Sequence, residues 1–299
     1  MAASIPDPLI LELRERIDNG DAEALAGWLE ERREASPDLV RQAIPWGPVG
    51  VEGGEQQDPH LSDPLHYVSD AVFHRLFRGD DPAAVARVLV KAGALIEGAG
   101  GRETPLHGAA SLGQAGVAEV LLDAGADLEA RAQYPGVPHG TPLGFAVEFG
   151  MVAVADLLVA RGAWRGSLRL AAGTGDLESV EELWGQRGSE EPEVLDAFRC
   201  AVVGERLEVM SYFLQRGVDL HSLVRNSTVL HWAAWEGKAE SAQWLLSRDA
   251  ARRDPEHDST PGGWALYRSE RLGAGWGHAR TVAVLARAEL EARQLGDPD

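Results

Sequence analysis

Residues 104–127 show a pattern of apolar and polar positions that predicts two short helices separated by a turn. Thr104 can supply the N-cap oxygen of the first helix, and Pro105 at its first position loses no donor that the helix needs. Gly113 marks the end of this helix, because glycine adopts a left-handed backbone conformation at low cost. In the second helix, Leu121 and Leu122 belong to an apolar face with helical spacing.

The same pattern returns along the chain at the spacing of a repeat protein. Well-formed copies begin at Thr141 and Thr228, each with a glycine and a leucine pair at matching offsets. Weaker copies occupy 65–94, 168–183, 197–217 and 260–285, and residues 11–29 have the two-helix rhythm of a capping repeat. Each unit can bury its apolar face only against its neighbours, so the pattern predicts a continuous stack.

With its Thr-Pro-Leu-His start at 104–107, its alanine pair at 109–110 and its closing Gly-Ala-Asp at 125–127, the sequence resembles the ankyrin repeat family. The resemblance covers nearly the whole chain after residue 60. It implies an all-α fold, an ankyrin-repeat α-solenoid of about eight helix-pair units with short hairpin fingers. Lysine occurs only at 91 and 238, which fits a GC-rich bacterial gene and leads us to expect a bacterial ankyrin repeat protein.

Irregular segments define the expected domain organisation. We expect an N-terminal helical cap over 1–41, a linker over 42–60 and one continuous set of repeats over 61–299, the last of them a C-terminal cap. The linker is expected because its sequence is rich in proline and glycine. Residues 132–140 lengthen one finger, and long loops are disproportionately functional.

The charge of the chain restricts its partners. With 28 basic and 47 acidic side chains the net charge is −19, which repels nucleic acid and anionic membrane surfaces. No apolar run approaches the roughly 18–20 residues of a membrane helix, and the first residues do not resemble a signal peptide. The single cysteine, Cys200, permits no internal disulfide. We therefore expect a cytoplasmic protein that binds neither nucleic acid nor membrane.

Motifs that carry catalysis, metal binding or cofactor binding are missing from the sequence. The nine histidines form no HExxH pair and no zinc-type cluster with cysteine. His107 and His231 stand where the family's histidine makes structural hydrogen bonds, and Cys200 occupies an alanine slot where a buried, inert thiol is expected. We expect no enzymatic activity, no metal and no cofactor.

Arg161, Arg165 and Arg169 form the one local basic cluster of the sequence. The simpler interpretation is that they neutralise nearby Asp156 and Glu148. The alternative is a docking point for an anion or an acidic partner side chain.

The resemblance also indicates where a partner binds. In ankyrin stacks the two residues before the helix-ending glycine face a concave surface, together with the finger tips. Apolar side chains at such positions, Val203 among them, are either exposed contacts or core, and both alternatives stay open here. The candidate partner-binding residues are Leu112, Tyr134, His139, Glu148, Phe149, Trp235, Glu236, Tyr267 and Arg268.

These observations predict a noncatalytic protein-protein interaction module that binds another protein through the concave face and fingers. The acidic charge favours a basic partner. Two alternatives remain open: an enzyme or small-ligand protein that uses an irregular pocket beside residues 42–60, and a scaffold that joins several partners.

Overall fold

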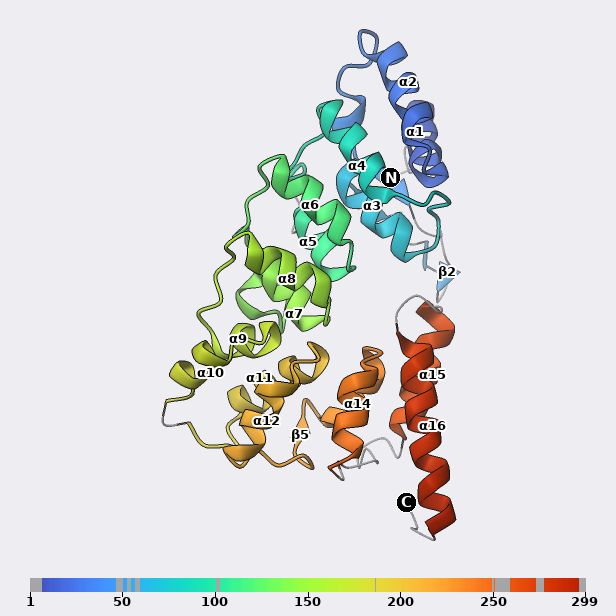
Figure 1. The fold of residues 1–299 in the computed structure, drawn as a ribbon. Coiled ribbons are helices and arrows are strands. Elements are labelled where there is room, and N and C mark those ends of the chain that lie inside the picture. Colours follow the sequence, from blue (N-terminus) through green and yellow to red (C-terminus); the bar gives the residue numbers. More distant parts are fainter. Residues whose placement is uncertain are drawn as a thin grey trace. The chain divides into compact units, whose positions relative to one another are not determined.

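Paired helices make up almost the whole fold (Figure 1). The computed structural model describes residues 7–46, 51–52, 55–56, 60–100, 103–185, 187–248, 250, 259–272 and 277–295. Within these ranges 16 α-helices follow one another in pairs, which confirms the expected all-α repeat fold. The pairs are α1 (Pro8–Asn19) and α2 (Ala22–Arg32), α3 (Pro64–Phe73) and α4 (Pro82–Lys91), α5 (Pro105–Ser111) and α6 (Ala115–Asp123), α7 (Pro142–Glu148) and α8 (Val152–Ala160), α9 (Leu168–Thr174) and α10 (Leu177–Trp184), α11 (Pro192–Val203) and α12 (Leu207–Gln215), α13 (Val229–Trp235) and α14 (Ala239–Leu246), and α15 (Pro261–Leu272) and α16 (His278–Leu295).

Contacts divide the chain into two compact units. Unit 1 holds residues 1–135 and 139–142, and unit 2 holds residues 136–138 and 143–299. The expected limits at residues 41 and 60 stay predictions. None of the helices in the described ranges has the length and hydropathy that a bilayer crossing requires.

Caps at the helix ends follow the sequence signals. Thr104 and His107 form a capping box at the start of α5, and the Thr228 side chain accepts a hydrogen bond from the backbone N–H of His231 in α13. The expected left-handed glycines end the first helices of four units: Gly113 (φ 72°), Gly150 (φ 64°), Gly175 (φ 82°) and Gly237 (φ 69°).

Gly204 is an exception to the expected pattern. Its φ is −83°, and the left-handed conformation passes to Glu205 at φ 54°. The reason for a glycine at 204 is space, because a Cβ there would lie 2.6 Å from the carbonyl oxygen of Gly173.

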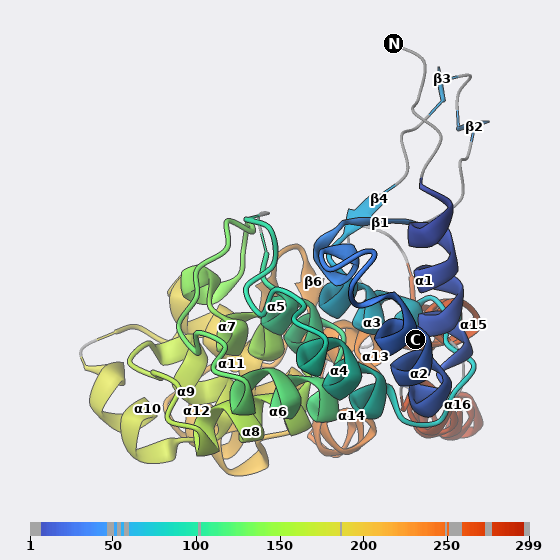
Figure 2. The same cartoon turned by 90° about the horizontal axis from the view of Figure 1, so that it is seen from above.

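In unit 1, α1 packs on α3 and α2 on α4, as the two views show (Figures 1 and 2). A buried hydrogen bond of 2.7 Å from the Tyr67 hydroxyl to Asp18 Oδ1 joins α3 to α1. The expected linker contains strands: β1 (Ile44–Trp46) pairs antiparallel with β4 (His60–Ser62), and β2 (Val51–Glu52) pairs with β3 (Glu55–Gln56).

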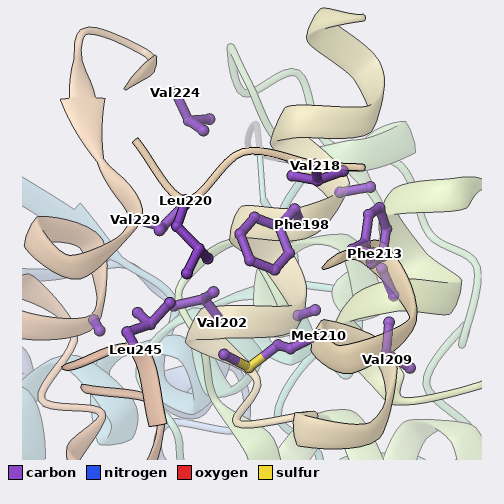
Figure 3. Packing of buried hydrophobic residues seen from close by; sticks show 14 of the residues in the cluster. Phe198, Val202, Val209, Met210, Phe213, Val218, Leu220, Val224, Val229 and Leu245 are labelled. Atoms are coloured by element: carbon purple, nitrogen blue, oxygen red, sulfur yellow. The ribbon is translucent and has the colours of Figure 1, made fainter. Parts of the chain in front are cut away.

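The core of unit 2 lies between the two helix layers. Phe198 of α11 packs beside Phe213 of α12, with ring centroids 5.6 Å apart, and Met210 and Leu245 extend the same cluster (Figure 3). A hairpin finger precedes α13, formed by β5 (Leu223–Val224) and β6 (Ser227–Thr228). Its two turn residues, Arg225 and Asn226, both have positive φ, as a tight two-residue hairpin turn requires.

Candidate interaction surface

His107 and His231 hold loops in place, as the sequence predicts. His107 is fully buried, and its Nε2 lies 2.9 Å from the carbonyl oxygen of Gly140 while Nδ1 lies 2.9 Å from the Thr104 hydroxyl. His231 repeats the arrangement with Thr228 at 2.7 Å and the Ser259 carbonyl at 3.1 Å. Because a carbonyl only accepts, Nε2 carries the proton in each ring. Burial also lowers the pKa of His107, which keeps the ring neutral.

Cys200 is buried, and burial raises the pKa of its thiol. Thiol chemistry needs the thiolate and access to it. The predicted inert, packed role of this residue therefore agrees with its surroundings.

A charged cluster joins the first helices of three successive repeats of unit 2 to the β5–β6 finger. Glu148 at the end of α7 accepts hydrogen bonds from three arginines: Arg169 of α9 at 2.8 Å, Arg199 of α11 at 2.7 Å and Arg225 of the finger at 2.6 Å. Asp196 of α11 contacts the same three guanidinium groups at 2.8, 2.9 and 3.1 Å. The five side chains are called the arginine cluster below.

Charge pairing keeps the Asp196 carboxylate of the arginine cluster ionised. Burial opposes ionisation of Asp196, but the charges of Arg199 and Arg169 outweigh it and lower the pKa of this carboxyl group. Arg199 is only 1% exposed, so its charge depends on these partners.

Most of the basic sequence cluster Arg161, Arg165 and Arg169 neutralises acidic neighbours. Arg169 binds Glu148, as the simpler interpretation predicts, and Arg165 lies 2.9 Å from Asp176. Asp156 instead pairs with Arg206 at 2.6 Å.

An aromatic group lies on α13 and α15. The rings of Trp235 and Tyr267 are stacked, with centroids 6.2 Å apart and planes 19° apart. Trp264 packs edge-on against Trp235 at 5.5 Å and against His231 at 5.1 Å. Tyr267 is 45% exposed, while Trp235 is half-buried. The guanidinium of Arg271 lies over the Tyr267 ring, 4.6 Å from its centroid, so the stack presents an ordered surface of aromatic rings and arginine to solvent.

Arg268 and Glu236 lie at the edge of this stack. The guanidinium of Arg268 covers the Trp235 ring at 4.5 Å, and its Nε donates to the Trp235 carbonyl at 3.3 Å. Its Nη2 is 3.8 Å from Glu236 Oε2. Burial raises the pKa of Glu236 to about 7, although Arg268, Lys238 and Arg199 oppose the shift. His278 of α16 lies 2.8 Å from the same Trp235 carbonyl.

Four of the predicted partner-binding residues come together here: Trp235, Glu236, Tyr267 and Arg268. Glu148 is linked to Glu236 through Arg199, which acts electrostatically on both. The aromatic group, Glu236, Arg268 and the arginine cluster are called the inner face of unit 2. Phe149 is half-buried beside Phe145, with centroids 6.4 Å apart.

The other predicted residues lie in unit 1. Leu112 is half-buried at the end of α5, Tyr134 is 47% exposed, and His139 is exposed with a φ of 57°. Among the apolar positions before the glycines, Val203 is fully buried, so of the two alternatives the core position holds for this residue. It packs in the core because α11 runs to Val203 itself and α12 packs against that helix.

Sequence reasoning missed Asp196, Arg199 and Arg225 as members of this face. The sequence does carry a signal for Asp196 and Arg199. These charged residues stand three positions apart in one helix, and Phe198 and Cys200, which flank Arg199, are core residues. No local signal places Arg225 next to Glu148, since the two are 77 residues apart.

A second polar group occupies unit 1 beside the expected linker. Trp46 lies between His60 at 5.3 Å and His74 at 4.7 Å, and the Ser62 hydroxyl donates to Asp70 at 2.7 Å. His66 Nε2 is 4.0 Å from Asp70. In the described part of the chain, no three His, Cys, Asp or Glu side chains are grouped so that they could hold a metal ion.

Comparison with known proteins identifies the repeats. The family described as ankyrin repeats (many copies) matches residues 198–246, and the family described as ankyrin repeat matches residues 102–133. A search of curated protein sequences gave no significant match.

Among solved structures, the chain is similar to the human ASB11 ankyrin repeat domain, with 20% identity, a TM-score of 0.35, and coverage of 76% of this chain and 98% of that one. It is also similar to the ankyrin repeat domain of Bcl-3, described as a unique member of the IkappaB protein family. That match has 20% identity, a TM-score of 0.38, and coverage of 94% of this chain and 98% of the other.

Proposed function

We propose that this chain, which belongs to the ankyrin repeat proteins, binds another protein without catalysing a reaction, and that the partner sits on the inner face of unit 2. Ankyrin repeats are generally protein-protein interaction modules. The proposal adds the place and manner of binding to that general role.

The stacked pair of Trp235 and Tyr267 is the observation that carries the proposal. Exposed aromatic side chains beside an arginine are typical anchors of protein interfaces. Arg268 holds the Trp235 ring from one side and Trp264 packs against it edge-on. A surface that is already ordered loses little conformational entropy on binding, so more of the contact energy remains as affinity.

Leu112, Tyr134 and His139 supply a second set of contacts in this proposal. Tyr134 and His139 lie on the long finger of unit 1 and are exposed.

The overall charge supports a basic partner and a cytoplasmic site of action. At −19 the chain attracts positively charged proteins over a Debye length and repels nucleic acid and anionic membranes. The single cysteine fits a reducing compartment. Raising the salt concentration is therefore expected to slow association.

Recovery of the partner from the native host tests the proposal. We expect the tagged chain to recover one stoichiometric partner, and the variant Trp235→Ala with Phe149→Ala to lose it while its circular dichroism stays helical. Leu290→Ala, at a residue 57% exposed on α16, is the control and should recover the partner normally. Equal recovery by the double variant would refute binding at this face.

The polar group of unit 1 keeps a second candidate function open. His60, His66, His74 and Asp70 gather beside the expected linker, where an enzyme or small-ligand site was the alternative. A turnover that depends on His66 or Asp70 would support that alternative. Recovery of several partners that bind at once would instead support a scaffold.

A further inference from the structure

We propose that the partner segment on the inner face of unit 2 presents an acidic side chain to Arg268 and an apolar side chain to Tyr267. This inference rests on the proposed function and assigns the chemistry of the contact. The net negative charge of the whole chain attracts a basic partner protein. The local charges of this face determine which partner side chain contacts Arg268.

Arg268 differs from the other arginines of the inner face in its partners. Arg169, Arg199 and Arg225 each lie within 3.1 Å of at least one carboxylate oxygen. Arg268 instead donates to a backbone carbonyl and covers an indole ring, and its ion pair with Glu236 spans 3.8 Å. Its guanidinium is thus held in one orientation while donors suited to a carboxylate fork remain without a short ion pair.

The charges around Arg268 also favour an incoming carboxylate. The positive charges of Arg268, Lys238 and Arg199 lower the pKa of Glu236. The negative charge of Glu148 raises it. Glu148 is already bound by three arginines. Since Glu236 itself is partly protonated near neutral pH, this region carries excess positive charge in a chain of net charge −19.

Tyr267 supplies the apolar half of the site. Tyr267 is 45% exposed as a residue and adjoins Arg268 along the chain. Its stacking on Trp235 and the Arg271 guanidinium, 4.6 Å from its ring centroid, fix its place. The Arg268 side chain is 23% exposed at the same edge. A segment with an acidic residue next to a leucine or aromatic residue can therefore engage both.

Proton uptake is a consequence of this arrangement. A carboxylate at Arg268 lies near Glu236 as well, so binding favours the protonated form of Glu236 and affinity rises as the pH falls from roughly 8 to 6. His278 faces the same carbonyl, and burial lowers its pKa, so its protonation adds an effect of the same sign only at pH values below its ordinary range. The variant Glu236→Gln separates the contributions of Glu236 and His278 to the pH dependence of affinity, because it removes the contribution of Glu236 alone.

Selection of random dodecapeptides displayed on phage against the full chain tests the inference. We expect enriched peptides that carry Asp or Glu beside Leu, Phe, Tyr or Trp. Arg268→Gln should weaken their binding by about tenfold, measured by calorimetry. The matched control Arg280→Gln, at a side chain 67% exposed on α16, should leave binding unchanged.

The outcomes distinguish this inference from the function on which it rests. Peptides that need Tyr267 but are basic, or that bind Arg268→Gln normally, would overturn the inference and leave the proposed face intact. Enriched peptides that bind Tyr267→Ala and Trp235→Ala as well as the native chain would overturn the proposed face itself. Failure of any peptide to be enriched would count against both.

Discussion

Arg225, at the tip of the β5–β6 finger, donates a hydrogen bond of 2.6 Å from Nη1 to Oε1 of Glu148, a residue 77 positions earlier in the chain. Repeat proteins are commonly stabilised by contacts between adjacent units alone. This bond passes over the repeats of α9 and α11, both of which contribute charged side chains to the same cluster. We therefore expect these repeats to unfold together.

A double-mutant cycle measures that coupling. Glu148→Gln should lower the free energy of unfolding by about 3 kcal/mol, because it leaves the buried Arg199 short of a carboxylate. Arg225→Gln should cost less, since the side chain is 35% exposed, and the two changes should couple by about 1 kcal/mol. Urea unfolding of the full chain is the measurement. Replacing Arg225→Gln by Arg280→Gln in the cycle should give additive effects, and additivity in the original cycle would contradict the account.

Two glycines should respond oppositely to alanine. Gly150 has a φ of 64°, and a Cβ there would lie 2.7 Å from the Val203 carbonyl oxygen, so Gly150→Ala should destabilise the chain by more than about 1 kcal/mol. Gly27 lies exposed within α2 with no atom within 4 Å of an added Cβ. Gly27→Ala should therefore stabilise the chain by about 0.5–1 kcal/mol. Thermal unfolding of both variants measures these changes in stability. A Gly150→Ala variant more stable than the native chain would be inconsistent with the close approach of the Val203 carbonyl to Gly150.

Cys200 should be unreactive in the folded chain. It is fully buried, and burial raises the pKa of its thiol, so both access and thiolate formation are suppressed. A thiol reagent such as DTNB should label the chain only after guanidinium chloride is added. The single cysteine makes the signal unambiguous, and rapid labelling of native protein would contradict the structure.

Glu236 should make stability depend on pH. Because burial raises its folded pKa to about 7, above the unfolded value, its protonated form stabilises the fold at low pH. That contribution is lost as the pH rises from about 4.5 through 7. Between these pH values the free energy of unfolding of the Glu236→Gln variant should therefore rise by up to about 3 kcal/mol relative to that of the native chain. Urea unfolding at successive pH values measures this difference. Parallel pH curves for the two chains would argue against a buried Glu236.

The helix pairs were predictable because each repeat carries its own local signals. Thr104 with Pro105, and Gly113, set the ends of α5 by capping and by a left-handed turn, which depend on neighbouring residues alone. Gly204 shows the limit of this reasoning. Gly204 has no side chain because the backbone of Gly173, in another repeat, approaches it closely. A local sequence pattern does not predict that approach.

The candidate surface was only partly predictable. Trp235, Glu236, Tyr267 and Arg268 follow from the register of the repeat relative to its glycine. The ion pairs of Arg199 and Arg225 with Glu148 depend on how successive repeats stack, and the finger turn at Arg225 aims its side chain across them. Whether Trp235 or Val203 is exposed depends on the same stacking, which a single sequence does not encode locally.

Site-specific photocrosslinking at Tyr267 tests the central claim most directly. The full chain with a benzophenone amino acid at position 267 would be expressed in its native host and irradiated, with the same probe at Leu290 as the exposed control. The account predicts one crosslinked protein at position 267, no such adduct at position 290, and loss of the adduct when Trp235→Ala is added. A chain that crosslinks equally at both positions, or at neither, would contradict binding at the inner face of unit 2.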